Sequence, residues 1–466
     1  RRIELLEKAL QVMLEGTYDK MLHYAHNLKN PITILHMLGV ILPILGLVIF
    51  PLIGSFLSGL VKWYHLAFLY NIILPIVVFA LGSNILSKRP TGYGEADITK
   101  INPEYRTYQT FHGIDPFPIA VLIGLVFILI SFIPFIVNYL NPGYDLNFLG
   151  GKFFDFKEFG GPYGVGSLIL SLLIPLGLAL AFSFYYKTRT KKLINIKRKT
   201  DDLEKEFAGA LFQLGNRIGD GIPAEIAFGK VAESTAGTES GKFFAMVNDN
   251  MRNSGMGLKE AIFNEKVGAV LFFPSKLIES SMKVLIEAAR KGPMVVSRSL
   301  ITISTYVDRI KQVNERLKDL LADVLSSMTS QITFLTPMIA GIVVGVGSMV
   351  VNIINKLSEQ FSTIGTLEGT ESIGGVAGIA SILRIEDVIP SFQFQAIVGI
   401  YVVELTIILT ILSTSIERGI DRITTQNRLS RNMVVGVGLY VLISLIGIII
   451  FNLLANAVGV VGTTTT

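Results

Sequence analysis

Seven apolar stretches, each close to the length of a bilayer-spanning helix, are the feature that most constrains this chain. A transmembrane helix needs roughly 20 mainly apolar residues. Stretches of this kind occur at 32–58, 65–87, 116–140, 163–186, 331–355, 391–415 and 433–457. Charged residues make up only 17% of the 466 residues, against about a quarter in soluble domains. The sequence therefore predicts an all-α, polytopic membrane protein with about seven transmembrane helices.

Lysine and arginine between these stretches predict the orientation of the chain, because short cytoplasmic loops are enriched in these cations. The segments 88–115, 187–199 and 416–432 are rich in them, whereas 141–162 and 356–390 are not. The N-terminus is therefore expected in the cytoplasm and the C-terminus outside the cell membrane. The net charge of +5 is explained by these loops, so we expect no nucleic-acid binding.

The longest polar segment, 187–330, lies between the fourth and fifth predicted spans and shows helical periodicity throughout. Asp201 is a candidate N-cap and Pro223 a candidate first residue of a following helix. Helix breaks are expected at Gly219, Gly221, Gly237, Gly292 and Pro293. The segment is therefore predicted to be a cytosolic bundle of five or six helices.

The predicted organisation of the chain has five parts. They are a cytosolic amphipathic helix (1–31), four transmembrane helices (32–186), the cytosolic bundle (187–330), three transmembrane helices (331–457) and an extracytoplasmic tail (458–466). Two segments, 1–58 and 305–355, share the order amphipathic helix, proline and glycine-rich span. Whether this order reflects a true duplication stays open.

Three patterns resemble sites that carry chemistry, but each lacks residues that the chemistry requires. Gly237–Phe243 resembles a P-loop but lacks one spacer residue, and Phe243 replaces the Ser or Thr that binds magnesium. Gly219-Asp220 resembles an aspartate motif of intramembrane proteases, whose chemistry needs two aspartates within the membrane. The histidine pair His23 and His26 has no evident third ligand for a metal. We therefore predict no catalytic, cofactor or metal site.

Glu404 is the one ionisable residue near the centre of a predicted span. A carboxyl group is costly in the bilayer core and marks a functional candidate. Two explanations stay open: a structural hydrogen bond to His36, Asn84 or Asn452, or a functional role in accepting a charged helix or relaying protons.

A family resemblance comes from two motifs in the polar segment. The string FAGALFQLGNRIGDGIPAEIAF at 207–228, followed by GLKEAI at 257–262, resembles the F-domain of type II secretion and type IV pilus platform proteins. The seven spans look most like the archaeal members of this family, including platforms of the archaellum and of archaeal pili. Those members typically carry two F-domains, and residues 1–31 look like the last helix of a first one.

The resemblance implies a non-enzymatic platform that couples a cytosolic hexameric ATPase to the insertion of pilin or archaellin subunits into a filament. Besides these partners it implies the lipid bilayer, and a homodimer stays open. Candidate ATPase-contacting residues are Arg217, Asp220, Lys259, Arg418, Arg422 and Arg428. The alternative from the residues alone is a transporter or channel that uses Glu404.

Overall fold

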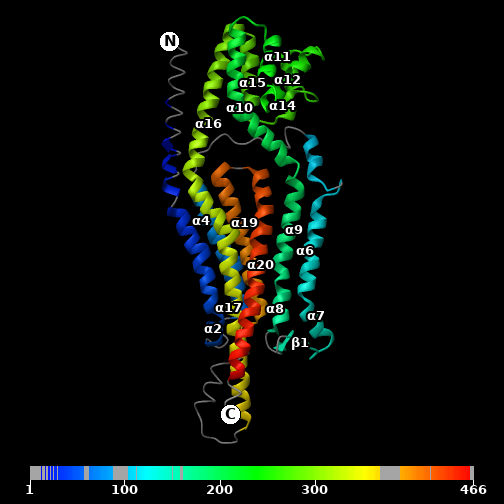
Figure 1. Ribbon diagram of the computed structural model, residues 1–466, viewed down its shortest axis with the longest axis vertical. Helices are drawn as coiled ribbons and strands as arrows, with labels where there is room; N and C mark the ends of the chain where they lie inside the picture. The colour runs from blue at the N-terminus through cyan, green and yellow to red at the C-terminus, as the bar shows by residue number, and fades with distance from the viewer. Residues whose placement is uncertain are drawn as a thin grey trace.

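The computed structural model confirms the all-α prediction and shows an elongated molecule, with a polar helical domain at one end and apolar helices below it (Figure 1). It describes residues 12, 16, 19–20, 22–24, 26–28, 30–56, 62–87, 103–111, 113–148, 151–157, 161–367, 389–419 and 421–461. Most of the predicted first F-domain helix (1–31), most of loop 88–115, part of loop 356–390 and most of the tail lie outside these ranges.

Among the described residues, six helices are long and apolar enough to cross a membrane, or seven if one bent pair counts as a single span. They are Leu22–Ile49, Trp63–Ser87, Val165–Thr190, Pro293–Ile354, Ser391–Arg418 and Arg422–Ala455, and the bent pair is Pro116–Ser131 with Ile133–Leu140. Apolar side chains such as Leu42, Ile76, Leu122 and Leu442 are exposed on the outer surface of this group. The chain is therefore a multi-pass membrane protein.

These spans form one packed group, called here the membrane bundle, and are built from the following elements. They are η1 (Met37–Ile41), α2 (Leu42–Phe56), α3 (Trp63–Phe68), η2 (Leu69–Ile73), α4 (Leu74–Ser87), α6 (Pro116–Ser131), α7 (Ile133–Leu140), α8 (Val165–Ser171), α9 (Leu173–Thr190), η4 (Gln331–Leu335), α17 (Thr336–Leu367), α19 (Ser391–Arg418) and α20 (Arg422–Val461). Two small antiparallel hairpins, β1 (Asn147–Phe148) with β2 (Gly151–Lys152) and β3 (Phe156–Lys157) with β4 (Gly161–Pro162), follow α7.

Three π-helical segments interrupt the spans, and each ends two residues before a proline. These segments, η1, η2 and η4, precede Pro43, Pro75 and Pro337 respectively. Proline has no N–H and its ring clashes with the carbonyl four residues earlier, so the helix widens there. Pro43 of the first span and Pro337 of the fifth predicted span are thus preceded by the same kind of segment.

A tyrosine hydroxyl donates a hydrogen bond to the carbonyl that Pro43, which has no N–H, cannot bond. In an α-helix the N–H of residue 43 would donate to the carbonyl of Gly39. The Tyr401 hydroxyl of α19 donates to that Gly39 oxygen at 2.6 Å, and the Tyr70 hydroxyl donates to the Pro43 oxygen at 2.9 Å. The rings of Tyr70 and Tyr401 meet edge to face, 5.6 Å apart. The kinked first span is thereby fixed to α19.

Glycines bring α17 and α20 into close contact. A Cβ on Gly345 would lie 3.0 Å from backbone atoms of Gly447, and one on Gly341 would lie 2.9 Å from the Ile443 side chain. Small residues spaced by four positions let transmembrane helices approach closely. Asn452 of α20 also donates to the Ser348 hydroxyl and accepts from Asn352. This pairing therefore holds the last span against α17.

The polar domain, residues 193–330, consists of α10 (Leu193–Gly219), α11 (Ala224–Ser234), α12 (Glu239–Arg252), α13 (Leu258–Phe263), α14 (Ala269–Phe272), α15 (Lys276–Ala289) and α16 (Pro293–Ser330). Its core is a separate cluster of buried side chains that includes Phe207, Phe228, Phe243 and Phe244. The long helices α10 and α16 lie side by side, and the Ser304 hydroxyl donates to the Ala208 oxygen at 2.7 Å.

The predicted helix breaks of this domain are confirmed, while the predicted N-cap Asp201 and the predicted first helical residue Pro223 are both wrong. Helix α10 ends at Gly219, and α16 begins at Pro293. The backbone φ angle is positive at Gly221 and at Gly237. Asp201 is not an N-cap but lies inside α10, because only two residues separate the start of this helix from the end of α9. Pro223 precedes the first residue of α11 with an extended ψ of 145° and is itself the N-cap.

Candidate functional site

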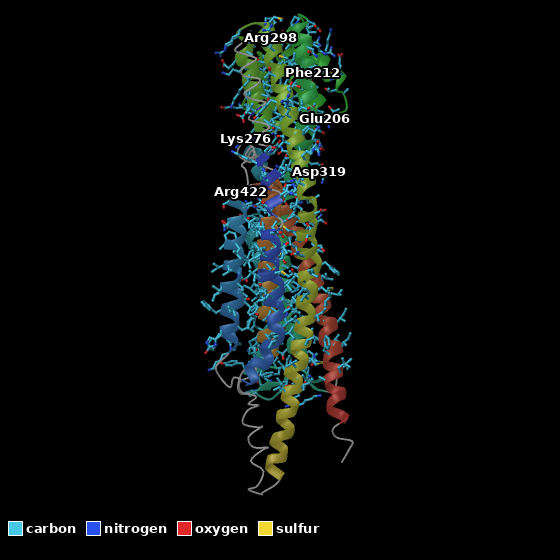
Figure 2. The ribbon with its side chains drawn as sticks, turned by 90° about the vertical axis from the view of Figure 1, so that its left-hand side faces the viewer. Glu206, Phe212, Lys276, Arg298, Asp319 and Arg422 are labelled. Atoms are coloured by element: carbon cyan, nitrogen blue, oxygen red, sulfur yellow. The ribbon has the colours of Figure 1, made fainter. Side chains whose placement is uncertain are left out.

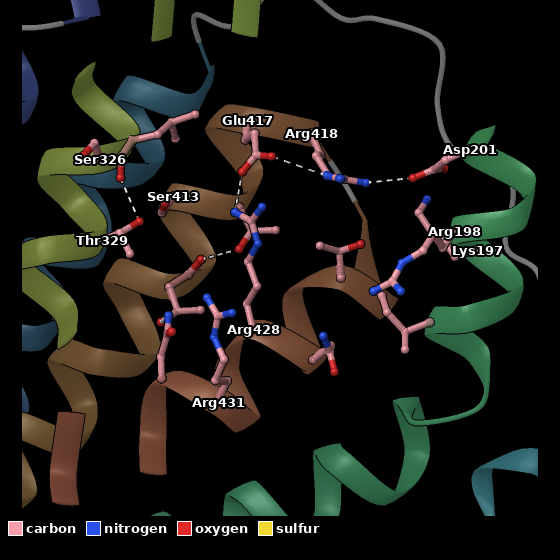
Figure 3. Close-up of a pocket in the computed structure, with 17 residues that line it drawn as sticks. Lys197, Arg198, Asp201, Ser326, Thr329, Ser413, Glu417, Arg418, Arg428 and Arg431 are labelled. Atoms are coloured by element: carbon pink, nitrogen blue, oxygen red, sulfur yellow. Dashed lines mark hydrogen bonds and ion pairs between the residues drawn. The ribbon is translucent and has the colours of Figure 1, made fainter. Parts of the chain in front are cut away.

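The polar domain meets the membrane bundle where the first turns of α10 contact the end of α19 and the start of α20, a region called here the junction (Figure 3). Two helices also connect the two parts through the chain itself. Only two residues separate α9 from α10, and α16, η4 and α17 run without a break from Pro293 to Leu367. The two parts are therefore joined by nearly continuous helices and by side-chain contacts.

A buried ion pair lies at the centre of the junction. Lys197 Nζ of α10 is 3.3 Å from Asp421 Oδ2, and the two side chains are only 9% and 3% exposed. Asp421 also caps α20, because its Oδ1 accepts from the Thr424 N–H at 3.0 Å. A buried charge that loses its partner is strongly destabilising, so this pair holds α10 in a fixed position against α20.

A second, partly exposed set of ion pairs surrounds the first. Arg418 Nη1, at the end of α19, donates to Asp201 Oδ2 of α10 at 3.1 Å, and Arg418 Nε lies 3.5 Å from Glu417 Oε1. Glu417 also accepts from Arg428 of α20. The side chains of Arg418 and Arg428 are 27% and 30% exposed. These contacts join α10, α19 and α20 through four charged side chains.

The helical segment η3 (Pro103–Gln109) adds contacts on the other side of α10. The Tyr105 hydroxyl donates to the Leu271 oxygen of the polar domain at 3.4 Å, and Arg189 Nη2 of α9 donates to Gln109 Oε1 at 3.0 Å. Lys192 Nζ lies 5.0 Å from the centre of the Tyr108 ring. This segment therefore contacts the end of α9, the turn before α10 and the polar domain.

A cavity of about 430 Å³ opens at the junction between α10, α16, α19 and α20. Figure 3 shows Arg198, Arg418, Arg428 and Arg431 among the side chains that line it. Five cationic and two acidic side chains line the cavity, together with several hydroxyl and amide groups. In the sequence these cations look like topology signals and do not predict a cavity, because their convergence depends on α10, which is far in sequence from α19 and α20.

The six candidate ATPase-contacting residues lie in two separate places. Arg217 and Asp220 are at the end of α10 farthest from the junction, roughly 30 Å from Lys197 along the helix. Lys259 is exposed on α13. Arg418 and Arg428 are held in ion pairs at the junction.

Arg422 is the member of this set that is exposed at the junction, at the level where the apolar helices end (Figure 2). The structure therefore brings Arg418, Arg422 and Arg428 together, and keeps Arg217, Asp220 and Lys259 on the polar domain away from them.

Glu404 lies in the middle of α19 and is half-buried. Its Oε2 and both ring nitrogens of His36 have no hydrogen-bond partner among the described residues. Asn452 does not serve Glu404, because it is bonded to Ser348, Asn352 and the Ile448 oxygen. Among the described residues, Glu404 therefore has no hydrogen bond to any of the three predicted structural partners, His36, Asn84 or Asn452.

The rejected P-loop pattern has a structural explanation. The Thr238 hydroxyl caps α12 by accepting from the Gly241 N–H at 3.0 Å, and Gly241 packs against the backbone of Thr235. Within the described ranges no group of three or more histidine or acidic side chains is arranged to hold a metal ion.

Comparisons of the chain with protein-family models, with curated proteins and with solved structures give no match.

Proposed function

We propose that this chain is the non-enzymatic membrane platform of a type IV filament assembly machine, of the archaeal pilus or archaellum kind. In this proposal the polar domain faces the cytoplasm, receives force from a hexameric ATPase and passes it to the membrane bundle. Movement of the bundle then inserts pilin subunits from the bilayer into the filament. Two things support the proposal. They are the F-domain resemblance of 207–228 and 257–262, and the helices and ion pairs that connect the polar domain to the membrane bundle at the junction.

The observation that supports the proposal most is the way in which the polar domain is fixed to the membrane bundle. The continuous helix from Pro293 to Leu367 and the near-continuous α9 and α10 lead from one part to the other. The buried pair of Lys197 and Asp421 prevents α10 from sliding over α20. An applied force on such a domain reaches the spans instead of being absorbed by a flexible linker.

The proposed ATPase surface is the outer part of the polar domain, with Arg217, Asp220 and Lys259, extended by Arg422 at the junction. Asp220, Lys259 and Arg422 are exposed and so are free to meet a partner. Arg418 and Arg428 are assigned to internal ion pairs rather than to the ATPase. The lipid bilayer surrounds the bundle, and the oligomeric state, including a homodimer, is left to experiment.

The test is a count of surface filaments by electron microscopy in host cells that lack the gene. We expect no filaments in the deleted strain and normal numbers after complementation with the wild-type chain. Arg422→Glu is expected to reduce filament number, while the Arg252→Glu control, on an exposed residue of α12, has a smaller effect. Normal filaments in the deleted strain would refute the proposal.

A second candidate function rests on Glu404. A carboxyl oxygen without a described partner inside a span is typical of transporters and proton relays. Glu404→Gln is expected to leave the fold intact because the substitution preserves shape. If ion flux into vesicles containing the purified chain depends on Glu404 and filaments do not, the chain is a transporter. If neither flux nor filament number changes, Glu404 has no functional role.

A further inference from the structure

We propose that the cavity at the junction binds a phosphate-bearing anion, and that this anion is the headgroup of an anionic phospholipid. The inference does not depend on filament assembly. It rests on the charge of the cavity, on one buried hydroxyl donor without a partner among the described residues, and on the position of the cavity.

The charge of the cavity is only partly neutralised by the chain itself. Asp201 and Glu417 line it and pair with Arg418 and Arg428, while Lys197 pairs with Asp421. Two further lining residues, Arg198 and Arg431, have no acidic partner within the described part of the chain. A cavity with two unpaired guanidinium groups favours an anion over any neutral or cationic ligand.

A buried donor adds specificity to this charge. Thr424 Oγ1 is buried, belongs to a residue that lines the cavity and makes no hydrogen bond within the described residues. A buried donor without a partner costs free energy unless a ligand or water accepts from it. Guanidinium and hydroxyl donors converging on one space suit the several oxygens of a phosphate group.

The position of the cavity favours a lipid as the source of the phosphate. The spans α9, α19 and α20 end or begin at Thr190, Arg418 and Arg422, so the cavity lies at the level where the apolar surface gives way to polar side chains. Phospholipid phosphates are found at this level of a bilayer, and basic pockets between spans bind such headgroups. A bound headgroup would contact α10, α19 and α20 together and would strengthen the junction.

The experiment is native mass spectrometry of the full chain in detergent, titrated with phosphatidylglycerol or with phosphatidylcholine. We expect a tight phosphatidylglycerol site and no matching phosphatidylcholine site. In the double variant Arg198→Gln with Arg431→Gln the affinity should fall by at least about tenfold, because two charge-assisted contacts are lost. Arg431→Lys keeps the charge without the planar fork and should give an intermediate loss.

The matched control is Arg252→Gln with Arg298→Gln, which removes two exposed cations from the polar domain. Arg298 lies far from the junction (Figure 2), so phosphatidylglycerol binding should not change. Equal affinities in the two double variants would overturn the anion site. Binding of inorganic phosphate that depends on Arg198 and Arg431, without a phosphatidylglycerol site, would overturn the lipid as its source. Circular dichroism of each variant separates misfolding from lost binding.

Discussion

Lys197 Nζ, near the start of α10, and Asp421 Oδ2, directly before α20, lie 3.3 Å apart. In the sequence, 223 residues lie between these two side chains. Both side chains are almost fully buried. A cation in the polar domain is thus matched by a carboxylate in the turn between two spans, so the polar domain and the membrane bundle cannot separate without breaking this ion pair.

Replacement of Lys197 by Met is expected to lower the free energy of unfolding by about 3–5 kcal/mol, because Asp421 is left buried without its cation. Asp421→Asn removes the same pair but keeps an N-cap for α20, so it isolates the ion pair from the cap. The midpoint of thermal unfolding in detergent measures both changes.

The control for this pair is the double variant Lys197→Met with Asp421→Asn. It should recover most of the stability lost in Lys197→Met, because no charge remains buried. A double variant that is as unstable as the sum of the two single ones would show that the ion pair does not hold the junction.

Tyr401→Phe is expected to lower the free energy of unfolding by about 1–3 kcal/mol, because the Gly39 oxygen then loses the hydroxyl donor at 2.6 Å. The loss should shrink in a Pro43→Ala background, where an N–H is restored to the helix. Thermal unfolding in detergent gives both values, with the exposed Tyr139 changed to Phe as control. Equal losses in the two backgrounds would contradict the role given to Tyr401.

Gly345→Ala should destabilise the pairing of α17 with α20 by about 1–3 kcal/mol, because the new Cβ meets the Gly447 backbone at 3.0 Å and the helices must shift. Gly438→Ala on α20 is the control, since no atom lies within 4 Å of its Cβ position. Proteolytic resistance of the purified variants reports the difference. An equally stable Gly345 variant would mean that close helix contact is not required here.

The pH dependence of stability should include a contribution from Glu204 of the polar domain. Burial raises the pKa of the Glu204 carboxyl above its usual range, although Ser275 donates a hydrogen bond to it. The folded protein therefore holds this proton to higher pH than the unfolded chain does. Stability from this group is present below the unfolded pKa and is lost as pH rises through the folded pKa.

Glu204→Gln removes this titration, so the variant should gain stability relative to the wild type as the pH rises from 4 toward neutrality. Thermal unfolding at several pH values measures the difference, with Glu260→Gln as an exposed control. A difference that does not vary with pH would show that the pKa of Glu204 is the same in the folded and unfolded states, so that burial does not raise it.

Much of this architecture could be predicted from the sequence because it depends on local patterns. Apolar stretches of about 20 residues located the spans, and Gly219, Gly292 and Pro293 located the helix ends. Asp201 was predicted wrongly as a cap because α10 starts eight residues earlier, almost directly after a span, without its own cap signal. The prolines predicted kinks, but they did not predict which side chain would donate to the backbone carbonyl that loses its N–H partner.

The junction could not be predicted because it depends on tertiary contacts. Lys197 and Arg418 look like ordinary topology cations in the sequence, and only the fold brings them to Asp421 and Asp201. The cavity likewise needs α10 and α20 side by side, which no periodicity indicates.

The most direct test of the proposed coupling is in-cell cross-linking of the tagged full chain in its native host, followed by purification and mass spectrometry. The account predicts cross-links from the polar domain, including Lys259, to a hexameric secretion-type ATPase, and recovery of a pilin subunit with the membrane bundle. Recovery of neither partner, together with Glu404-dependent ion flux through vesicles containing the purified chain, would contradict it.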